Sequence, residues 1–432
     1  GLSCAFYLAE KGYKPVVFEK NERPGGMLTY GIPSFKLQKD VIEAEVEVIR
    51  LMGAEFRYGV EVGRDVTLDE LRAQGFKAFY VAIGCQGGRL AGIPGEDAED
   101  VTVAVDFLRE VNSGKIDALP GRTIVVGGGN VAIDVARNAC RLGSDHVEMF
   151  CLESEAQMPA SEEERREAVE DGAHISCGWG PKEVHLDEAG RVCGITFKRC
   201  TRVFDDEGRF APEYDENDLR RVDADRVVMS IGQSIVWGDL LAGSKVELGR
   251  GQGALADPQT YQTAEPDIFV GGDVYTGPSF AIDAIAAGHE AAVSIHRFVQ
   301  PGSTLTIGRN QRRYTALDRD DVVIESYDNA SREVAHVDRE REKAAPFSEY
   351  VETFTEEQVR AETARCLGCG ASIVDPNKCI GCGLCTTKCA FDAIHLDRDR
   401  PECSTMVKYE QKLPSLGKYA LKRAIKIKFG RK

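Results

Sequence analysis

The sequence predicts an α/β fold of two interleaved domains, followed by a small cysteine-rich domain. Up to about residue 300, short apolar segments that end in glycine or in an acid alternate with segments of helical periodicity. Glycine-rich turns connect several of these apolar segments to the helical ones, and a dense group of cysteines occupies residues 366–389. Strands that alternate with helices favour parallel sheets. We therefore expect doubly wound domains before residue 300 and a separate small domain after it.

Composition and charge narrow the class of protein. The 432 residues carry a formal net charge of −16, which argues against nucleic acid as a general partner. No apolar run reaches the roughly 18 residues that a membrane span requires, so we expect none. Half of the 14 cysteines lie outside the C-terminal group and are scattered without the spacing of paired disulfides. Unpaired thiols fit a reducing compartment, so we expect a cytoplasmic protein.

The first residues have the pattern of the second half of a dinucleotide-binding unit. Residues 1–12 have helical spacing and end in glycine, and residues 15–19 form an apolar strand that ends at Glu19. Glu19 follows Gly1 at about the distance at which such an acid binds a ribose hydroxyl. We interpret Gly1 as the last glycine of a GxGxxG turn and expect the first strand to precede it, so that the sequence is a fragment. The alternative is that Glu19 is a solvated acid at the end of a strand.

A complete second unit lies at residues 123–136. It has a buried strand, the glycines Gly127–Gly129 and a helix with apolar residues at intervals of three and four. Such a turn places a pyrophosphate at the helix N-terminus, where free amides and the helix dipole favour negative charge. Two units in one chain indicate two nucleotides, and the usual pairing is FAD with NAD(P). Residues 179–222 alternate apolar and polar side chains and predict an antiparallel excursion.

Three segments carry a resemblance to a known family. Residues 25–33 (GGMLTYGIP) resemble the flavin-binding segment of the glutamate synthase small subunit family. That family includes the flavin-bearing half of dihydropyrimidine dehydrogenase and the large subunit of NADH-dependent ferredoxin:NADP oxidoreductase. Residues 79–84 resemble the strand that closes its flavin domain. Residues 267–288 resemble the second flavin signature, in which an aspartate, here Asp273, bonds the ribityl chain. The resemblance implies two Rossmann-like domains that bind FAD and NAD(P).

The choice of nicotinamide cofactor depends on the turn after the strand at residues 147–151. In NADPH-using members of the family, this turn carries two arginines that pair with the 2′-phosphate. Here Leu152 and Glu153 occupy those places. A carboxylate repels a phosphate but accepts hydrogen bonds from a bare ribose, so we predict a preference for NADH over NADPH. The alternative is that Glu153 faces solvent and that the choice is made elsewhere.

Motif and resemblance together give one set of expected nucleotide-binding residues. It consists of Gly1, Glu19, Lys20, Gly25, Gly26, Met27, Gly31, Ile32, Ala82, Gly84, Gly127, Gly128, Gly129, Asn130, Val131, Glu153, Gly232, Gly272, Asp273 and Ala281.

The cysteine spacing is that with which ferredoxins hold a 4Fe-4S cluster: gaps of two residues, then one of three. A tetrahedral zinc site is the main alternative, because paired CxxC motifs also suit zinc, although zinc rarely needs the third cysteine and the CxxxC step. The expected ligands form one set of Cys379, Cys382 and Cys385, a second set of Cys366, Cys369 and Cys389, and Cys403 nearby. Each set lacks a fourth ligand. We favour two clusters over a single cluster with spare cysteines.

These motifs predict the following domains: the first part of an FAD-binding domain at residues 1–118, its start missing; an NAD-binding domain at 119–235; the second part of the FAD-binding domain at 236–300; a linker wrapped over the surface at 301–354; a ferredoxin-like domain at 355–405; and a basic tail at 406–432. Residues 412–432 contain eight Lys or Arg and no acid. We expect the tail to dock on an acidic partner subunit, and a solubilising terminus is the alternative.

The expected function follows from the number of electrons that each cofactor transfers at a time. NADH delivers two electrons as hydride and an iron–sulfur cluster takes one at a time, so a flavin belongs between them. We expect an oxidoreductase subunit that passes electrons to a partner subunit or a ferredoxin, an electron-bifurcating complex being one form. We name no catalytic acid or base. The alternatives are a self-contained reductase of a small substrate, such as a glutamate synthase-like or pyrimidine-reducing enzyme, and a non-catalytic assembly subunit.

Overall fold

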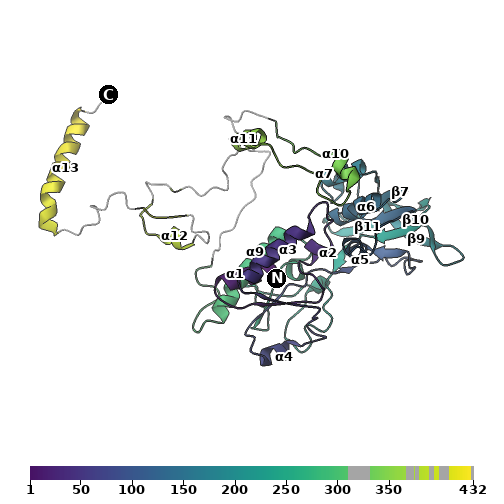
Figure 1. Ribbon diagram of the computed structural model, residues 1–432, viewed down its shortest axis with the longest axis horizontal. Coiled ribbons are helices and arrows are strands. Elements are labelled where there is room, and N and C mark those ends of the chain that lie inside the picture. Colours follow the sequence, from purple (N-terminus) through teal and green to yellow (C-terminus); the bar gives the residue numbers. More distant parts are fainter. Residues whose placement is uncertain (310–330, 366–373, 375–378, 389–393, 398–407, 430–432) are drawn as a thin grey trace. The chain divides into compact units, whose positions relative to one another are not determined.

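The structure, a computed structural model, describes residues 1–309, 331–365, 374, 379–388, 394–397 and 408–429 (Figure 1). The chain divides into two compact units. The first comprises Gly1–Ser326 and Glu333–Glu356, and the second comprises Tyr327–Arg332 and Glu357–Lys432. The first unit contains both nucleotide-type domains.

The flavin-type domain is built from two stretches of chain. Its elements are α1 (Leu2–Glu10), β1 (Val16–Glu19), α2 (Met27–Tyr30), α3 (Lys39–Leu51), β2 (Glu55–Tyr58), α4 (Leu68–Ala73), β3 (Phe79–Val81), β14 (Ile268–Val270), α8 (Asp273–Thr276) and α9 (Ala281–Phe298). The strands pair in parallel as β1 with β2 and β3 with β14. Thus a strand near residue 80 finds its partner only after the whole nicotinamide-type domain has been inserted.

Small residues allow the helices of this domain to pack closely. Helix α1 lies against α9 and α3 (Figure 1). A Cβ added at Gly288 of α9 would come within 2.9 Å of the Cβ of Ser3 and 3.0 Å of the backbone nitrogen of Cys4. Ser3 Oγ donates a 2.7 Å hydrogen bond to the carbonyl oxygen of Ile285. The glycine therefore fixes how closely α9 approaches α1.

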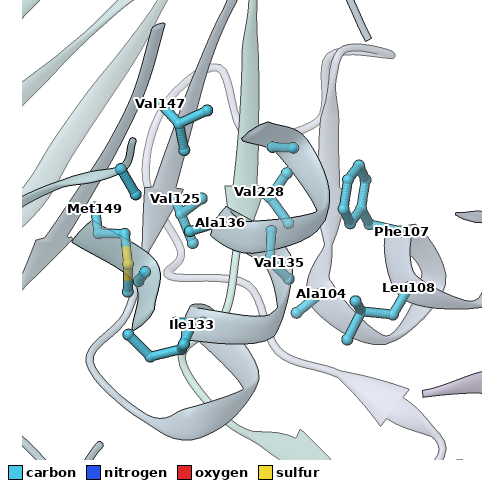
Figure 2. Close-up of a cluster of buried hydrophobic side chains, with 14 of the residues drawn as sticks. Ala104, Phe107, Leu108, Val125, Ile133, Val135, Ala136, Val147, Met149 and Val228 are labelled. Atoms are coloured by element: carbon cyan, nitrogen blue, oxygen red, sulfur yellow. The ribbon is translucent and has the colours of Figure 1, made fainter. Parts of the chain in front are cut away.

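The nicotinamide-type domain is a five-stranded parallel sheet in the order β5-β12-β6-β7-β8. Its elements are β4 (Gly87–Gly88), β5 (Val101–Val103), α5 (Ala104–Asn112), β6 (Arg122–Val126), α6 (Asn130–Arg141), β7 (His146–Cys151), α7 (Glu162–Glu170), β8 (His174–Cys177), β12 (Arg226–Met229) and β13 (Gln233–Ser234). Figure 2 shows α5 and α6 packing their apolar faces on this sheet. Val125, Val228 and Ile133 are fully buried there. Burial on both faces explains why these strands are continuous apolar runs.

An antiparallel sheet extends from this domain, as the alternation at residues 179–222 predicts. Its strands are β9 (Trp179–Leu186), β10 (Val192–Phe204) and β11 (Phe210–Val222), with β10 in the centre. Phe197 of β10 stacks on Phe150 of β7 with ring centroids 3.9 Å apart, and both rings are fully buried. This pair ties the antiparallel sheet to the parallel one.

The segment Glu333–Glu356, most of which the sequence predicts as part of a linker, belongs to the first unit. They contain α10 (Arg339–Ala344) and an antiparallel bridge between Val337 and Val351. Tyr350 is buried and its hydroxyl accepts a 2.6 Å hydrogen bond from Arg137 of α6. This segment is thus a built part of the nicotinamide-type domain.

The second unit holds the described helices α11 (Glu356–Ala364), α12 (Leu384–Lys388) and α13 (Tyr409–Phe429). Helix α13 carries exposed apolar and basic side chains and contains Pro414. Within the described chain, every helix is too short or too polar to cross a membrane.

Candidate nucleotide and iron–sulfur sites

Glycines from three separate segments line one cradle in the flavin-type domain. Gly25 and Gly26 precede α2 with φ values of +104° and +52°, Gly84 follows β3 with φ +66°, and Gly272 follows β14 with φ +69°. These are conformations that only glycine adopts without strain. A Cβ at Gly84 would lie 3.9 Å from Asp273 Oδ2, so the strand ends bring Gly84 and Asp273 together. Backbone without side chains at this point fits the close approach of a nucleotide cofactor.

Asp273 is the acid of this cradle. It begins α8, and its Oδ1 accepts a 3.3 Å hydrogen bond from the backbone nitrogen of Ser279. Burial raises the pKa of its carboxyl group, against the hydrogen bonds that Ser279 and Cys85 give it. Among the described residues no cation lies within ion-pair distance of it. A half-buried acceptor of this kind fits a neutral hydroxyl donor, as a ribityl chain offers.

The other expected flavin residues lie at the ends of neighbouring elements of this domain. A Cβ at Gly1 would lie 3.7 Å from the Cβ of Ala82, so the start of α1 meets the end of β3. Glu19 ends β1 and accepts 2.9 and 2.6 Å hydrogen bonds from the backbone and side chain of Asn21. Lys20 is exposed and lies 3.9 Å from Glu61. Ala281 is the exposed first residue of α9.

Met27, Gly31 and Ile32 form the capped turn of α2. The backbone nitrogens of Gly31 and Ile32 donate to the carbonyl oxygen of Met27 at 2.9 and 2.8 Å. A Cβ at Gly31 would come within 2.7 Å of Met27 Sδ, so the glycine allows the methionine to fold over the turn. These residues therefore shape residues 25–33, the flavin-type segment.

Sequence reasoning missed two residues of the cradle. Gln86 follows Cys85, and its Nε2 would lie 3.7 Å from a Cβ at Gly26 and equally 3.7 Å from one at Gly84. Its Oε1 accepts a 2.8 Å hydrogen bond from Arg109 of α5. Neither residue belongs to a recognisable motif, and only the folded chain brings them together. The nearest sequence signal is the position of Gln86, two residues after the glycine that ends an apolar strand.

The glycine turn of the nicotinamide-type domain has the predicted shape. Gly127 has φ +145°, and a Cβ there would collide with the carbonyl oxygen of Ser230 at the end of β12. Gly129 caps α6, which has no side-chain hydrogen bond at its N-terminus. Asn130 and Val131 begin the helix, and Asn130 Oδ1 accepts a 3.2 Å hydrogen bond from Ser161. Uncapped amides at the start of a twelve-residue helix fit a pyrophosphate.

Glu153 lies beside this turn. A Cβ at Gly128 would be 3.0 Å from Glu153 Oε2 and 2.9 Å from the Cβ of Cys151, so the carboxylate folds back towards the glycines. The backbone oxygen of Glu153 accepts a 2.9 Å hydrogen bond from Gly178 after β8. Gly232, after β12, has φ +122°, and a Cβ there would lie 3.5 Å from Arg89. The strand ends thus bring Glu153 and the glycine turn together.

A partly buried ion-pair cluster joins the two domains. Lys36, just after the flavin-type segment, lies 2.5 Å from Asp134 of α6 and also contacts Glu164 of α7. Burial opposes the charge on Lys36, but the two carboxylates outweigh it and raise its pKa. Burial raises the pKa of Asp134 to about 6, although Lys36 opposes that rise. This contact fixes how the segment meets the nicotinamide-type domain.

Of the expected iron–sulfur ligands, the structure describes Cys379, Cys382 and Cys385. All three are exposed. The backbone nitrogen of Gly381 donates a 3.4 Å hydrogen bond to Cys379 Sγ, and Gly381 and Gly383 have φ values of +65° and +77°. No group of three metal-binding side chains forms within the part of the chain that is described. The remaining expected ligands lie outside the described residues: Cys366, Cys369, Cys389 and Cys403.

A thiolate loop with glycines between its cysteines fits the chemistry of an iron–sulfur cluster, because amide groups that donate to sulfur stabilise its negative charge. Several cysteines of the first unit, by contrast, are unsuited to that chemistry. Burial raises the pKa of Cys4 to about 12 and that of Cys85 to about 11. Cys151 and Cys177 lie 3.7 Å apart on neighbouring strands, and burial raises the pKa of Cys151. A raised pKa keeps Cys4, Cys85 and Cys151 as unreactive thiols.

Comparison with known proteins supports both kinds of site. A family model described as pyridine nucleotide-disulphide oxidoreductase matches residues 1–288, and one described as 4Fe-4S binding domain matches residues 372–395. The NADP(+)-dependent formate dehydrogenase subunit beta of Moorella thermoacetica is 34% identical over 388 residues, covering 85% of this chain and 53% of that protein. The glutamate synthase (NADPH) small chain of Escherichia coli is 34% identical over 319 residues, covering 69% and 66%.

A third relative, the NADPH-Fe(3+) oxidoreductase subunit beta of Geobacter sulfurreducens, is 29% identical over 408 residues, covering 85% of this chain and 60% of that protein. The chain therefore spans about half to two thirds of the length of these relatives. Among solved structures, Mycobacterium tuberculosis FprA has a TM-score of 0.59 at 19% identity, covering 69% of this chain and 82% of its own. At that identity it shows the fold alone. The predicted fold of two Rossmann-like domains is confirmed.

Proposed function

Because this chain belongs to the pyridine nucleotide-disulphide oxidoreductase family and carries a 4Fe-4S binding domain, we propose that it passes electrons from a nicotinamide dinucleotide through FAD to iron–sulfur clusters. The predicted relation to the glutamate synthase small subunit is confirmed as well. The observation that carries the proposal is the presence of two glycine cradles and a ferredoxin-type cysteine loop in one chain. FAD, when bound, supplies the conversion of one hydride into two single electrons.

The residues of the chain have separate tasks in this proposal. Gly26, Gly84 and Gly272 let the backbone approach the flavin, and Asp273 accepts a hydrogen bond from its ribityl chain. The free amides at the start of α6 bind the pyrophosphate of the nicotinamide dinucleotide. Lys36 holds the flavin-type segment against α6 and so limits the movement of one domain against the other. No side chain is needed as an acid or a base.

We propose NADH as the preferred donor. Glu153 carries the argument, because its carboxylate folds towards Gly128 at the place where the adenosine ribose of a dinucleotide lies in this fold. A 2′-phosphate there would meet a negative charge, whereas a 2′-hydroxyl would donate a hydrogen bond to it. Three relatives named above act with NADP(H) according to their names. We attribute the proposed preference of this chain for NADH, in contrast to these relatives, to Leu152 and Glu153.

The acceptor in our proposal is a partner subunit or a ferredoxin. The names of two relatives call them beta subunits, and the name of a third calls it a small chain. These names indicate proteins that are parts of larger enzymes. Helix α13, basic and exposed, offers an arm for an acidic partner. The ten described cysteines are all free thiols. Because free thiols persist in a reducing compartment, we propose that the protein is cytoplasmic.

Anaerobic titration with NADH tests the proposal directly. We expect the absorption band of the bound flavin to bleach on addition of NADH. An added oxidised ferredoxin should then restore the band as it is reduced. A flavin-loaded protein whose band does not change with NADH or NADPH contradicts the proposal. Bleaching without reduction of the ferredoxin would restrict the acceptor to a dedicated partner subunit.

A further inference from the structure

Gln86 occupies a defined position in the flavin cradle. Its Nε2 lies at the same 3.7 Å from the Cβ positions of Gly26 and Gly84, which belong to different segments. Asp273 Oδ2 lies 3.9 Å from the Cβ position of Gly84. A carboxamide and a carboxylate thus face the same side-chain-free backbone. The cradle contains an acceptor that motifs predict and, beside it, a polar group that they do not.

Arg109 decides which end of the carboxamide faces the cradle. The guanidinium has only N–H donors, so the atom that it contacts at 2.8 Å must be the oxygen of Gln86. The NH₂ group is therefore turned towards the glycines, and no acceptor for it is found among the described residues. The NH₂ group is thus fixed in orientation and left to donate to water or to a ligand.

Arg109 is itself held in place. Its Nη1 donates a 2.8 Å hydrogen bond to Asn21 Oδ1, and its Cζ lies 5.1 Å from the ring centroid of Tyr30. Within the described chain, no carboxylate lies within ion-pair distance of it. Its positive charge therefore remains available to polarise the carboxamide of Gln86, which makes the NH₂ group a stronger donor.

We propose that Gln86 contacts the bound flavin cofactor by donating a hydrogen bond from its NH₂ group, and that Arg109 is the residue that positions it. The inference rests on the proposed flavin site and names a group in it. Arg109 comes from α5, which packs on α6 of the nicotinamide-type domain. The hydrogen bond therefore connects flavin binding to the position of the other domain.

The test is FAD binding to the apoprotein of the full chain, followed by flavin fluorescence. Gln86→Leu removes the donor at similar size, and Gln86→Glu keeps a partner for Arg109 but has no N–H. We expect each to weaken FAD binding about tenfold, as the loss of one hydrogen bond does. Gln74→Leu, at an exposed position on the surface, is the matched control and should bind FAD like the wild type.

The role of Arg109 has its own readout. Arg109→Met should weaken FAD binding about threefold to fivefold, and Arg109→Lys should restore part of the loss. Because Arg109 acts through Gln86, the double variant Gln86→Leu/Arg109→Met should bind FAD no more weakly than Gln86→Leu alone. Losses that add would overturn the positioning role.

The outcomes separate this inference from the proposed function. A wild-type protein that binds no FAD contradicts the proposed function. A wild type that binds FAD, together with a folded Gln86→Leu variant of equal affinity, overturns the inference and leaves the proposed function intact. Circular dichroism and the melting temperature of each apoprotein verify that the variants are folded, so that a loss of affinity reports the contact itself.

Discussion

Glu153 is the residue on which the choice between the two nicotinamide cofactors depends. Replacing it with arginine puts a cation beside Gly128, where the carboxylate now lies. We expect Glu153→Arg to lower kcat/KM for NADH at least tenfold and to raise that for NADPH, because the charge then attracts a 2′-phosphate. Steady-state kinetics with both donors measure the ratio. Glu155→Arg, two residues on and exposed, is the control. An unchanged ratio in Glu153→Arg would show that the choice is made elsewhere.

Lys36 is the residue that links the domains, and its removal has a pH-dependent cost. Lys36→Met leaves Asp134 buried without its cation, which should lower the free energy of unfolding by about 3 kcal/mol at pH 8. The folded pKa of Asp134 is raised from 3.8 to about 6, so its ionised form destabilises the fold above pH 6 and this cost is relieved as the pH falls towards 4.

The loss in Lys36→Met should therefore be smaller at pH 5 than at pH 8, because Asp134 takes up a proton. Urea denaturation of the variant and the wild type at both pH values gives the comparison. Lys77→Met, at an exposed lysine, should cost little at either pH. A loss that is equal at pH 5 and pH 8 would mean that Asp134 does not carry the effect.

The turn between β6 and α6 depends on one of its glycines more than on the others. Gly127 has φ +145° and faces the carbonyl oxygen of Ser230, so Gly127→Ala should destabilise the domain by roughly 2–4 kcal/mol. Gly129 has φ −91° and open space at its Cβ position, so Gly129→Ala should leave the fold nearly unchanged. Thermal unfolding of the two variants distinguishes them. Equal melting temperatures would contradict this account of the turn.

Local patterns predict elements well where the whole pattern lies within one segment. The strand, glycine turn and helix at residues 122–141 are of this kind, and the structure confirms them. The contacts of Gln86 with Arg109 and of Lys36 with Asp134 join segments 23 and 98 positions apart, and no periodicity marks them. The burial of Tyr350 against Arg137 cannot be predicted from the sequence for the same reason, because the residues around Tyr350 are polar and weakly periodic.

At the scale of the whole molecule, the number of iron–sulfur clusters sets how many redox centres the electrons pass through after the flavin. We favour two, so iron and acid-labile sulfide should each amount to about eight per flavin, against about four for a single cubane. Colorimetric iron and sulfide analysis against flavin absorbance gives the count. Cys382→Ser should remove about four irons and leave reduction of the flavin by NADH intact. A wild-type value of four would reject the second cluster.

The insertion of one domain into the other sets the order in which the chain folds as it is made. Strand β3 is synthesised long before its partner β14. Likewise Arg72 is synthesised 195 positions before Asp267, the residue to which it donates a hydrogen bond. At 5–20 residues per second, this delay is roughly 10–40 s. The inserted nicotinamide-type domain has all of its parallel strands between these points, so we expect it to fold first. We expect the apolar faces of α1 and β3 to be open to chaperones during that interval, and flavin uptake to be a late event in biosynthesis.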